Sequence, residues 1–94
     1  MTRSPATATQ VIDDARVRVT RFDFAPGAET GWHEHGMDYV ITAVTDCHML
    51  LVDDDGERRV TVTQGERDRR NCGVKHNVIN DGDNKMSFVE VELK

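Results

Sequence analysis

The sequence has little of several features that would place it in a particular structural class. No window shows apolar residues at the i, i+3, i+4, i+7 spacing of an amphipathic helix. No apolar run approaches the ~20 residues that cross a bilayer. Residues 1–10 have no apolar stretch of the signal-peptide kind. These absences argue against a helical domain, a membrane partner and secretion, and the expected location is the cytoplasm.

Cysteine and positive charge are also scarce. The only cysteines are Cys47 and Cys72, which are too few for a disulfide scaffold and too far apart for a CxxC metal or redox motif. We expect two free, partly buried thiols. Lys and Arg number 12 against 17 Asp and Glu, and the formal net charge is −5. This balance, without a long basic block, argues against a nucleic-acid partner.

The size of the chain predicts one domain with a thin core. It has 94 residues, of which 37% are hydrophobic, and a domain this small buries a modest fraction of its surface. A homodimer that covers further apolar surface is therefore expected. Residues 1–14 begin with a stretch rich in Thr, Ala, Ser and Pro and are predicted to be a flexible tail or a swapped arm. Residues 15–94 are predicted to form the single domain.

Strand signals fill the rest of the chain. Short alternating or β-branched segments are separated by turns containing Gly, Asp or Asn, which predicts an all-β barrel or sandwich. In residues 15–25 the apolar positions change parity between Val19 and Phe22, which suggests a bulge or a bend between sheets near residues 20–21. The acidic residues 53–55 lack the spacing of a calcium loop and are expected in a solvated hairpin turn.

The histidines carry the main functional signal. His33 and His35 are two apart, so on a strand they share one face. His76 lies on a separate predicted strand, whereas His48 has no partner at ligand spacing and is expected at the surface. A pair of this kind can hold a metal or be a bystander. The glycines around it favour a defined position, and inward-facing neutral imidazoles suit first-row divalent metals.

Two spaced motifs resemble those of the cupin family. Gly27 is followed by five residues and then by His33-x-His35, as in the first cupin motif. The second motif is matched by residues 65–80. Gly65 is followed by five residues and then by Asn71-x-Gly73, and His76 comes after two more residues, with Asn80 three residues further on. Asn71 replaces a Pro of the family motif. The resemblance extends over residues 17–93. It implies a double-stranded β-helix, or jelly-roll barrel, with the histidines facing its cavity, and glycines 27, 65 and 73 in turns.

The chain departs from the cupin pattern at the metal-binding Glu. That residue would fall at Tyr39 or Val40, and Asp38 is one residue early. The resemblance therefore implies a site of three ligands, His33, His35 and His76, for Fe, Mn, Zn or Ni. Tyr39 is the candidate catalytic or weak fourth group. Three-histidine sites of this kind occur in cupin thiol dioxygenases, and the sequence is also similar to small cupins associated with β-alanine degradation.

The resemblance and the strand parity also predict the surroundings of the site. Glu34 should point outward, Asn80 should support the fold, and Glu90 is a nearby candidate base. Phe22 and Phe88 are expected outside, at a dimer contact. The cavity is predicted to be small and mostly apolar, lined by Tyr39, Ile41, Val60, Val62, Val78, Val89 and Val91.

Three functions fit these observations. The first is a metal-dependent enzyme that acts on a small organic molecule, dioxygenase-like or an isomerase or lyase. The second is a non-catalytic metal- or ligand-binding cupin, such as a sensor or accessory protein. The third is a structural barrel without metal, which the placement of three histidines in two motifs makes the weakest of the three.

Overall fold

The computed structural model describes residues 3–94, which form strands connected by turns. No helix in this part of the chain is long and apolar enough to cross a membrane. The predicted all-β class is confirmed. The strands are β1 (Thr7–Asp13), β2 (Val17–Phe24), β3 (His33–Glu34), β4 (Asp38–Ala43), β5 (Cys47–Asp53), β6 (Gly56–Val62), β7 (Arg67–Arg70), β8 (Lys75–Asn80) and β9 (Met86–Leu93).

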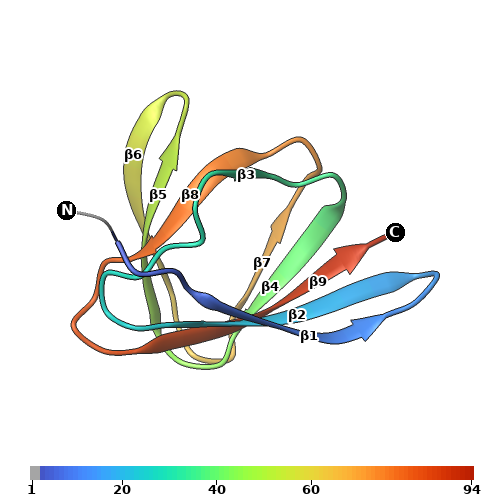
Figure 1. Cartoon of the computed structure of the whole chain (residues 1–94), viewed down its shortest axis with the longest axis horizontal. Helices are drawn as coiled ribbons and strands as arrows, with labels where there is room; N and C mark the ends of the chain where they lie inside the picture. The colour runs from blue at the N-terminus through green and yellow to red at the C-terminus, as the bar shows by residue number, and fades with distance from the viewer. Residues whose placement is uncertain (1–2) are drawn as a thin grey trace.

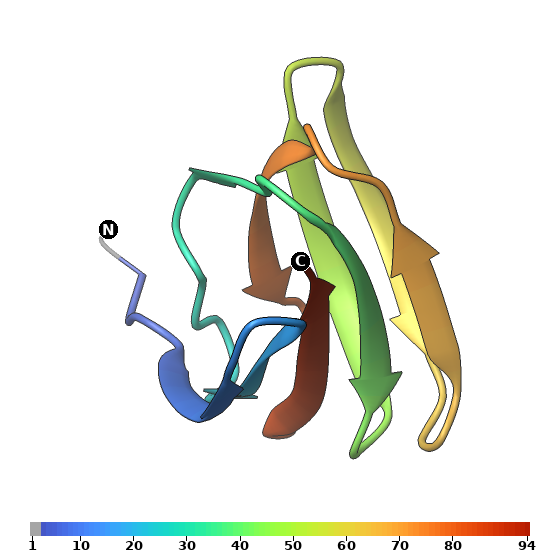
Figure 2. The same cartoon turned by 90° about the vertical axis from the view of Figure 1, so that its right-hand side faces the viewer.

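The strands make two antiparallel sheets that pack face to face as a jelly roll. The larger sheet has the order β1-β2-β9-β4-β7, and the smaller has the order β3-β8-β5-β6. Apart from the β1–β2 and β5–β6 hairpins, neighbouring strands in each sheet are distant in sequence, as in a double-stranded β-helix. The β5–β6 hairpin projects beyond the rest of the chain in both views, and β1 lies beside β2 at the edge of the larger sheet (Figures 1 and 2).

The N-terminal segment is more ordered than a tail. Residues 7–13 form β1 and pair with β2 of the same chain, with a register shift between Gln10 and Ile12. All seven side chains of β1 are exposed. Residues 1–2, part of the predicted tail, lie outside the described residues. The strand thus closes one side of the larger sheet within its own chain, and its outer edge has no strand partner among residues 3–94.

The core lies between the two sheets and corrects part of the predicted lining. Phe88 is 2% exposed and Phe22 packs against the same cluster, so neither lies outside as expected. Val89 and Val91 are on the opposite face of β9 from Phe88 and do not line the interior. The buried cluster consists of Phe24, Ala28, Tyr39, Ile41, Ala43, Cys47, Met49, Leu51, Val62, Val78, Met86 and Phe88, with Val60 packed against it.

Strands β2 and β9 explain these errors. The β2–β9 register is continuous from Val17 opposite Leu93 to Phe24 opposite Met86. A register shift does lie beside Thr20, but it is in the β1–β2 pairing and the extra residue belongs to β1, so the predicted irregularity was assigned to the wrong strand. Because successive side chains alternate between faces, the face that carries Phe22 also carries Arg18. The face of β9 that carries Phe88 likewise carries Glu90. One end of the barrel interior is therefore polar.

The glycines of the two motifs have the predicted turn conformation. The φ angles of Gly27, Gly65 and Gly73 are 80°, 84° and 91°. Glycine reaches these left-handed values without the steric cost that a Cβ would impose. The two motif turns thereby lead into the segments that carry the histidines.

Candidate metal centre

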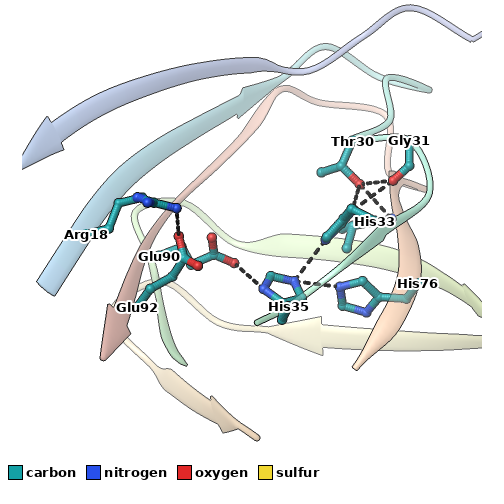
Figure 3. A network of polar contacts seen from close by, with 9 residues as sticks. Arg18, Thr30, Gly31, His33, His35, His76, Glu90 and Glu92 are labelled. Carbon is teal, nitrogen blue, oxygen red and sulfur yellow. Dashed lines mark hydrogen bonds and ion pairs between the residues drawn. The ribbon is translucent and has the colours of Figure 1, made fainter. Parts of the chain in front are cut away.

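Three imidazoles converge at the polar end of the barrel. His33 on β3 lies directly opposite His76 on β8, and His35 follows β3. Nε2 of His35 is 2.9 Å from Nε2 of His33 and 3.1 Å from Nε2 of His76. All three nitrogens point toward one another (Figure 3). The structure therefore brings together the three predicted ligands.

The spacing and chemistry of these nitrogens fit a divalent metal. If two nitrogens each bind one ion at ~2.1 Å and the nitrogen–metal–nitrogen angle is a right angle, the two nitrogens lie about 3.0 Å apart. Each imidazole nitrogen has one in-plane site, which is either a proton or a lone pair. Nε2 of His35 therefore cannot donate to His33 while accepting from His76. One cation shared by three lone pairs satisfies both contacts, and this observation supports metal binding.

The backbone before His33 fixes its tautomer. Nδ1 of His33 is 2.8 Å from the carbonyl oxygen of Gly31, which can only accept a hydrogen bond, so the proton is assigned to Nδ1. Nε2 is left with its lone pair for a metal. Gly31 in turn donates its N–H to Oδ1 of Asn77 at 2.9 Å, and Asn77 donates to Glu29 at 2.7 Å. Sequence reasoning missed this support, because Asn77 is far from Gly31 in the chain.

Burial keeps the other two histidines neutral. His35 and His76 are 6% and 7% exposed. Burial, and then the neighbouring imidazoles, lower the pKa of each to about 4. Both rings are consequently uncharged near pH 7, which is the form that binds metals.

Glu90 on β9 places a carboxyl group beside His35. Its Oε1 lies 3.7 Å from Nδ1 of His35, on the side of the ring away from the other histidines (Figure 3). Burial, and then the charge of Glu92, raise the pKa of Glu90 to about 7. Because burial also disfavours the charged form of His35, we regard the contact as a polar one and not as an ion pair at neutral pH. Glu90 is therefore placed to orient His35.

Tyr39 is one of the two positions at which the resemblance places the family Glu, and it lies against His35. It is 0% exposed, and its ring stacks on His35 with centroids 3.8 Å apart and planes 18° apart. Burial, and then Glu90, raise the pKa of the phenol. Its hydroxyl is buried and has no hydrogen-bond partner. The predicted contact with the site is present, but a catalytic role stays a prediction.

Other predicted residues have separate roles. Asp38 accepts a hydrogen bond from the backbone N–H of Cys72 at 2.7 Å and is not part of the histidine cluster. Glu34 is exposed, as predicted, and pairs with Lys75 at 3.9 Å. Asn80 is 2% exposed, and its side-chain nitrogen lies 2.8 to 3.3 Å from three carbonyl oxygens. Its supporting role is therefore confirmed.

The two thiols differ from each other. Cys47 is buried and contacts the carbonyl oxygens of Thr45 and Ser87, whereas Cys72 is exposed and not partly buried as expected. Burial raises the pKa of Cys47. Neither thiol belongs to the metal-type cluster formed by the three histidines.

The predicted apolar cavity is also corrected. Tyr39 and Ile41 do face the interior, but on β9 the inward residues beside the histidines are Glu90 and Glu92. A surface pocket of about 370 Å³ lies elsewhere, between β5, β6 and the turn after β8, and includes His48 and Arg59. His48 is exposed, as predicted.

Comparisons with known proteins agree with this geometry. Over 92 residues the chain is 46% identical to the beta-alanine degradation protein BauB of Pseudomonas aeruginosa, covering 98% of this chain and 97% of BauB. A crystal structure of a cupin domain from Bordetella pertussis is similar along 100% of this chain and 98% of its own, with 46% identity and a TM-score of 0.97.

A more distant structure shows the fold alone. A Klebsiella pneumoniae protein with a double-stranded beta-helix domain has 18% identity and a TM-score of 0.80, and the match covers 99% of this chain and 80% of that one. The family model described as the cupin domain matches residues 20–92. The jelly-roll topology, the two motifs and these matches together show that the chain belongs to the cupin domain family.

Proposed function

We propose that this chain is a metal-dependent enzyme acting on a small organic molecule at His33, His35 and His76. The observation that supports this most directly is the convergence of three Nε2 atoms, with separations of 2.9 and 3.1 Å. A divalent transition metal bound there supplies Lewis-acid chemistry, and Fe or Mn supplies oxygen chemistry as well. Zn and Ni also fit the ligand set.

The surrounding residues support a reactive site. Gly31 orients His33 through its carbonyl oxygen, and Glu90 faces Nδ1 of His35. Three protein ligands leave further positions for a water or a substrate, as catalytic metal sites require. Glu90 is also the nearest candidate for holding a proton, because its carboxyl group is buried beside the cluster.

The name of one relative suggests the metabolic setting. BauB is called a beta-alanine degradation protein, and we propose that this chain acts on a small molecule in the same kind of degradative metabolism. Dioxygenase-like chemistry, in which the substrate is oxidised by O₂, is the first reaction type to test, and isomerase or lyase chemistry is the next.

A non-catalytic metal- or ligand-binding role is the second candidate. It is favoured by the replacement of the family Glu by Tyr39, which is fully buried against His35. A protein of this kind would hold a metal in the same three histidines and would not turn over a substrate.

Metal content is the first measurement. Untagged protein should contain near-stoichiometric divalent metal by elemental analysis, and a His33→Ala, His76→Ala double variant should contain almost none. A His48→Ala variant is the matched control, because it removes an exposed histidine outside the cluster. Oxygen uptake by the loaded protein with candidate small molecules then separates the enzyme from the binding protein.

Two results would contradict the proposal. If the parent contains no metal and binds no added Fe, Mn, Ni or Zn, the site does not function as a metal centre. If the loaded protein binds small molecules but neither consumes oxygen nor isomerises or cleaves them, the second candidate stands.

A further inference from the structure

The outer face of the larger sheet is apolar at its centre, although it points away from the core. On β2, β9 and β4 the side chains of this face alternate with the buried ones. Six of them are apolar and at least partly exposed, and we name them the valine face: Val17, Val19, Val40, Val89, Val91 and Leu93. An antiparallel sheet with one solvated face usually carries polar residues on that face. The composition of the valine face therefore favours burial.

The six side chains form one continuous patch. Val19 lies opposite Val91, and Val91 lies opposite Val40, so three valines make a row across the three central strands. Val17 lies opposite Leu93 in a neighbouring row. Side chains that are directly opposed on one face of a sheet are within contact range. Leu93 is 42% exposed, so the patch is open to solvent at this end.

Charged side chains surround the valine face. They stand on the same outer face, around the apolar centre or on the edge strand β7, and are Arg21, Asp23, Asp38, Arg67 and Arg69. Three positive and two negative groups nearly cancel, whereas the whole chain has a formal net charge of −5. Two copies of the chain can therefore meet on this face with little like-charge repulsion. An apolar centre with a polar rim is also typical of protein interfaces.

No part of the described chain forms a third layer over this face. All nine strands of residues 3–94 belong to one of the two sheets. Residues 4–6 hydrogen-bond to Glu29, which is bridged to Ile79 of the smaller sheet, so they lie away from the valine face. The two views show the same two layers (Figures 1 and 2). Burial of the valine face therefore requires another molecule.

The size of this sheet face matches what a stable dimer needs. β2 and β9 each have eight residues, which span about 26 Å, and five strands at ~4.8 Å spacing span about 20 Å. The flat area is roughly 500 Å² before the relief of the side chains is counted. A stable interface removes about 800 Å² of accessible surface from each partner. Because side-chain relief and the charged rim add to the flat area, one face can supply one partner's share.

We propose that the valine face packs against the valine face of a second copy of this chain, with a two-fold axis between the copies. Two sheets that stack face to face lie ~10 Å apart and interdigitate their side chains, which β-branched residues suit. A two-fold contact uses the same patch on both copies, so the near-balanced charge of the rim is also compatible with it. Ile12, opposite Val19, extends the central row onto β1 and belongs to the same surface. This inference is independent of the metal centre.

Light scattering on the full chain tests this interface. The parent should have the mass of a dimer, and a Val19→Lys, Val91→Lys variant should have the mass of a monomer. The two lysines should raise the dissociation constant of the dimer at least about 100-fold, because each copy loses two apolar contacts and would bury two charges. Circular dichroism and metal content should match the parent, since both positions point away from the core and the histidines.

Two further variants complete the experiment. Val52→Lys is the matched control, because Val52 is a partly exposed valine that alternates with the buried Leu51 on the outer face of the smaller sheet. It should remain a dimer. A Val19→Ala, Val91→Ala variant keeps the sheet apolar, so it serves if the lysines prevent folding. It should raise the dissociation constant by at least about tenfold.

Each outcome decides for or against the valine face. Dissociation by the two valine-face variants, with the Val52→Lys variant still dimeric, would support the proposal. A dimer that persists in both valine-face variants, or that Val52→Lys dissociates equally, would place the interface elsewhere and overturn it. A monomeric parent would also overturn it and would leave the face for a partner other than a second copy.

Discussion

At the scale of single residues, burial decides the chemistry of the centre. His35 and His76 have ordinary side chains, but the barrel removes them from water and favours their neutral forms. The same burial favours the protonated form of Glu90. His35 and His76 are thereby neutral near pH 7, so a cation can bind without first displacing protons from these two rings.

The stability of chelator-treated, metal-free protein should depend on pH through these groups. In the unfolded chain His35 and His76 bind protons below about pH 6.5, but in the folded chain only below about pH 4. Between these values the unfolded chain binds more protons, so the free energy of unfolding rises with pH. Glu90 acts oppositely between about pH 4.5 and 7. Two histidines outweigh one carboxyl group, and the net rise should be about 3 kcal/mol.

Urea denaturation across pH 4 to 8 measures this dependence. The free energy of unfolding should be highest near pH 6.5 and should fall slightly toward pH 7 and above. His76→Asn should reduce the slope between pH 4 and 6.5, and His48→Asn should leave it unchanged. A maximum below pH 5 in the parent would contradict the assignment.

Glu90→Gln should weaken metal binding. The carboxylate faces Nδ1 of His35 at 3.7 Å, and outer partners of ligating histidines typically affect metal affinity by 10- to 100-fold. We expect a loss of about tenfold in competition titrations with a metal chelator. Glu34→Gln is the matched control, because this exposed residue lies between the two ligands in sequence and points away. Equal losses in both variants would show that only overall charge matters.

At the scale of elements, β2 and β9 show that a polar site can reverse which face of a strand carries the apolar side chains. In both strands the inward face is apolar at one end and polar at the other. Phe22 and Phe88 fill the core, whereas Arg18 and Glu90 lie on the same faces near the histidines. Apolar side chains at the polar end of each strand are turned outward. A prediction that places every apolar residue inside therefore assigns the wrong face to the interior at the polar end of each strand.

The loop before β3 is a second element that the site depends on. Gly31 has a φ of 86°, and its carbonyl oxygen holds His33. A Cβ at Gly31 would meet no neighbour, so the cost of an alanine there is backbone strain alone. We expect Gly31→Ala to lower the free energy of unfolding by about 1–2 kcal/mol and to weaken metal binding.

Gly36→Ala is the control for this prediction. Gly36 also has open space around its Cα but has no positive φ. Its replacement should change the free energy of unfolding by less than about 0.5 kcal/mol. Urea denaturation and metal titration of both variants make the comparison, and equal effects would mean that the conformation of Gly31 is not required.

At the scale of the whole molecule, the expected homodimer stays a prediction. The outer edge of β1 has no strand partner among residues 3–94, and its residues Val11 and Ile12 are 60% and 45% exposed. Edges of this kind pair readily with another chain. We expect a dimer by light scattering and a monomer for a Val11→Lys, Ile12→Lys variant. Thr7→Lys, Thr9→Lys adds the same charge to the same strand as a control. A monomeric parent would contradict the expectation.

Much of the architecture follows from local sequence alone. Turn residues and alternating segments predicted an all-β barrel or sandwich, and the resemblance of two spaced motifs to those of the cupin family implied the jelly roll and the ligands His33, His35 and His76. These features are readable because turn conformation and side-chain parity depend on neighbouring residues. The exposed positions of Glu34 and His48 followed from the same reasoning.

The tertiary structure decided which side chains complete the site. Glu90 faces His35 from β9, and Asn77 supports Gly31 from β8. These contacts join residues more than 20 positions apart, so they depend on sheet order and register. The sequence by itself determined the all-β class, because turns and strand alternation are local, and its two cupin-like motifs identified the jelly roll and the three ligands by resemblance. The polar surroundings required the assembled barrel, because strand pairing alone brings those residues together.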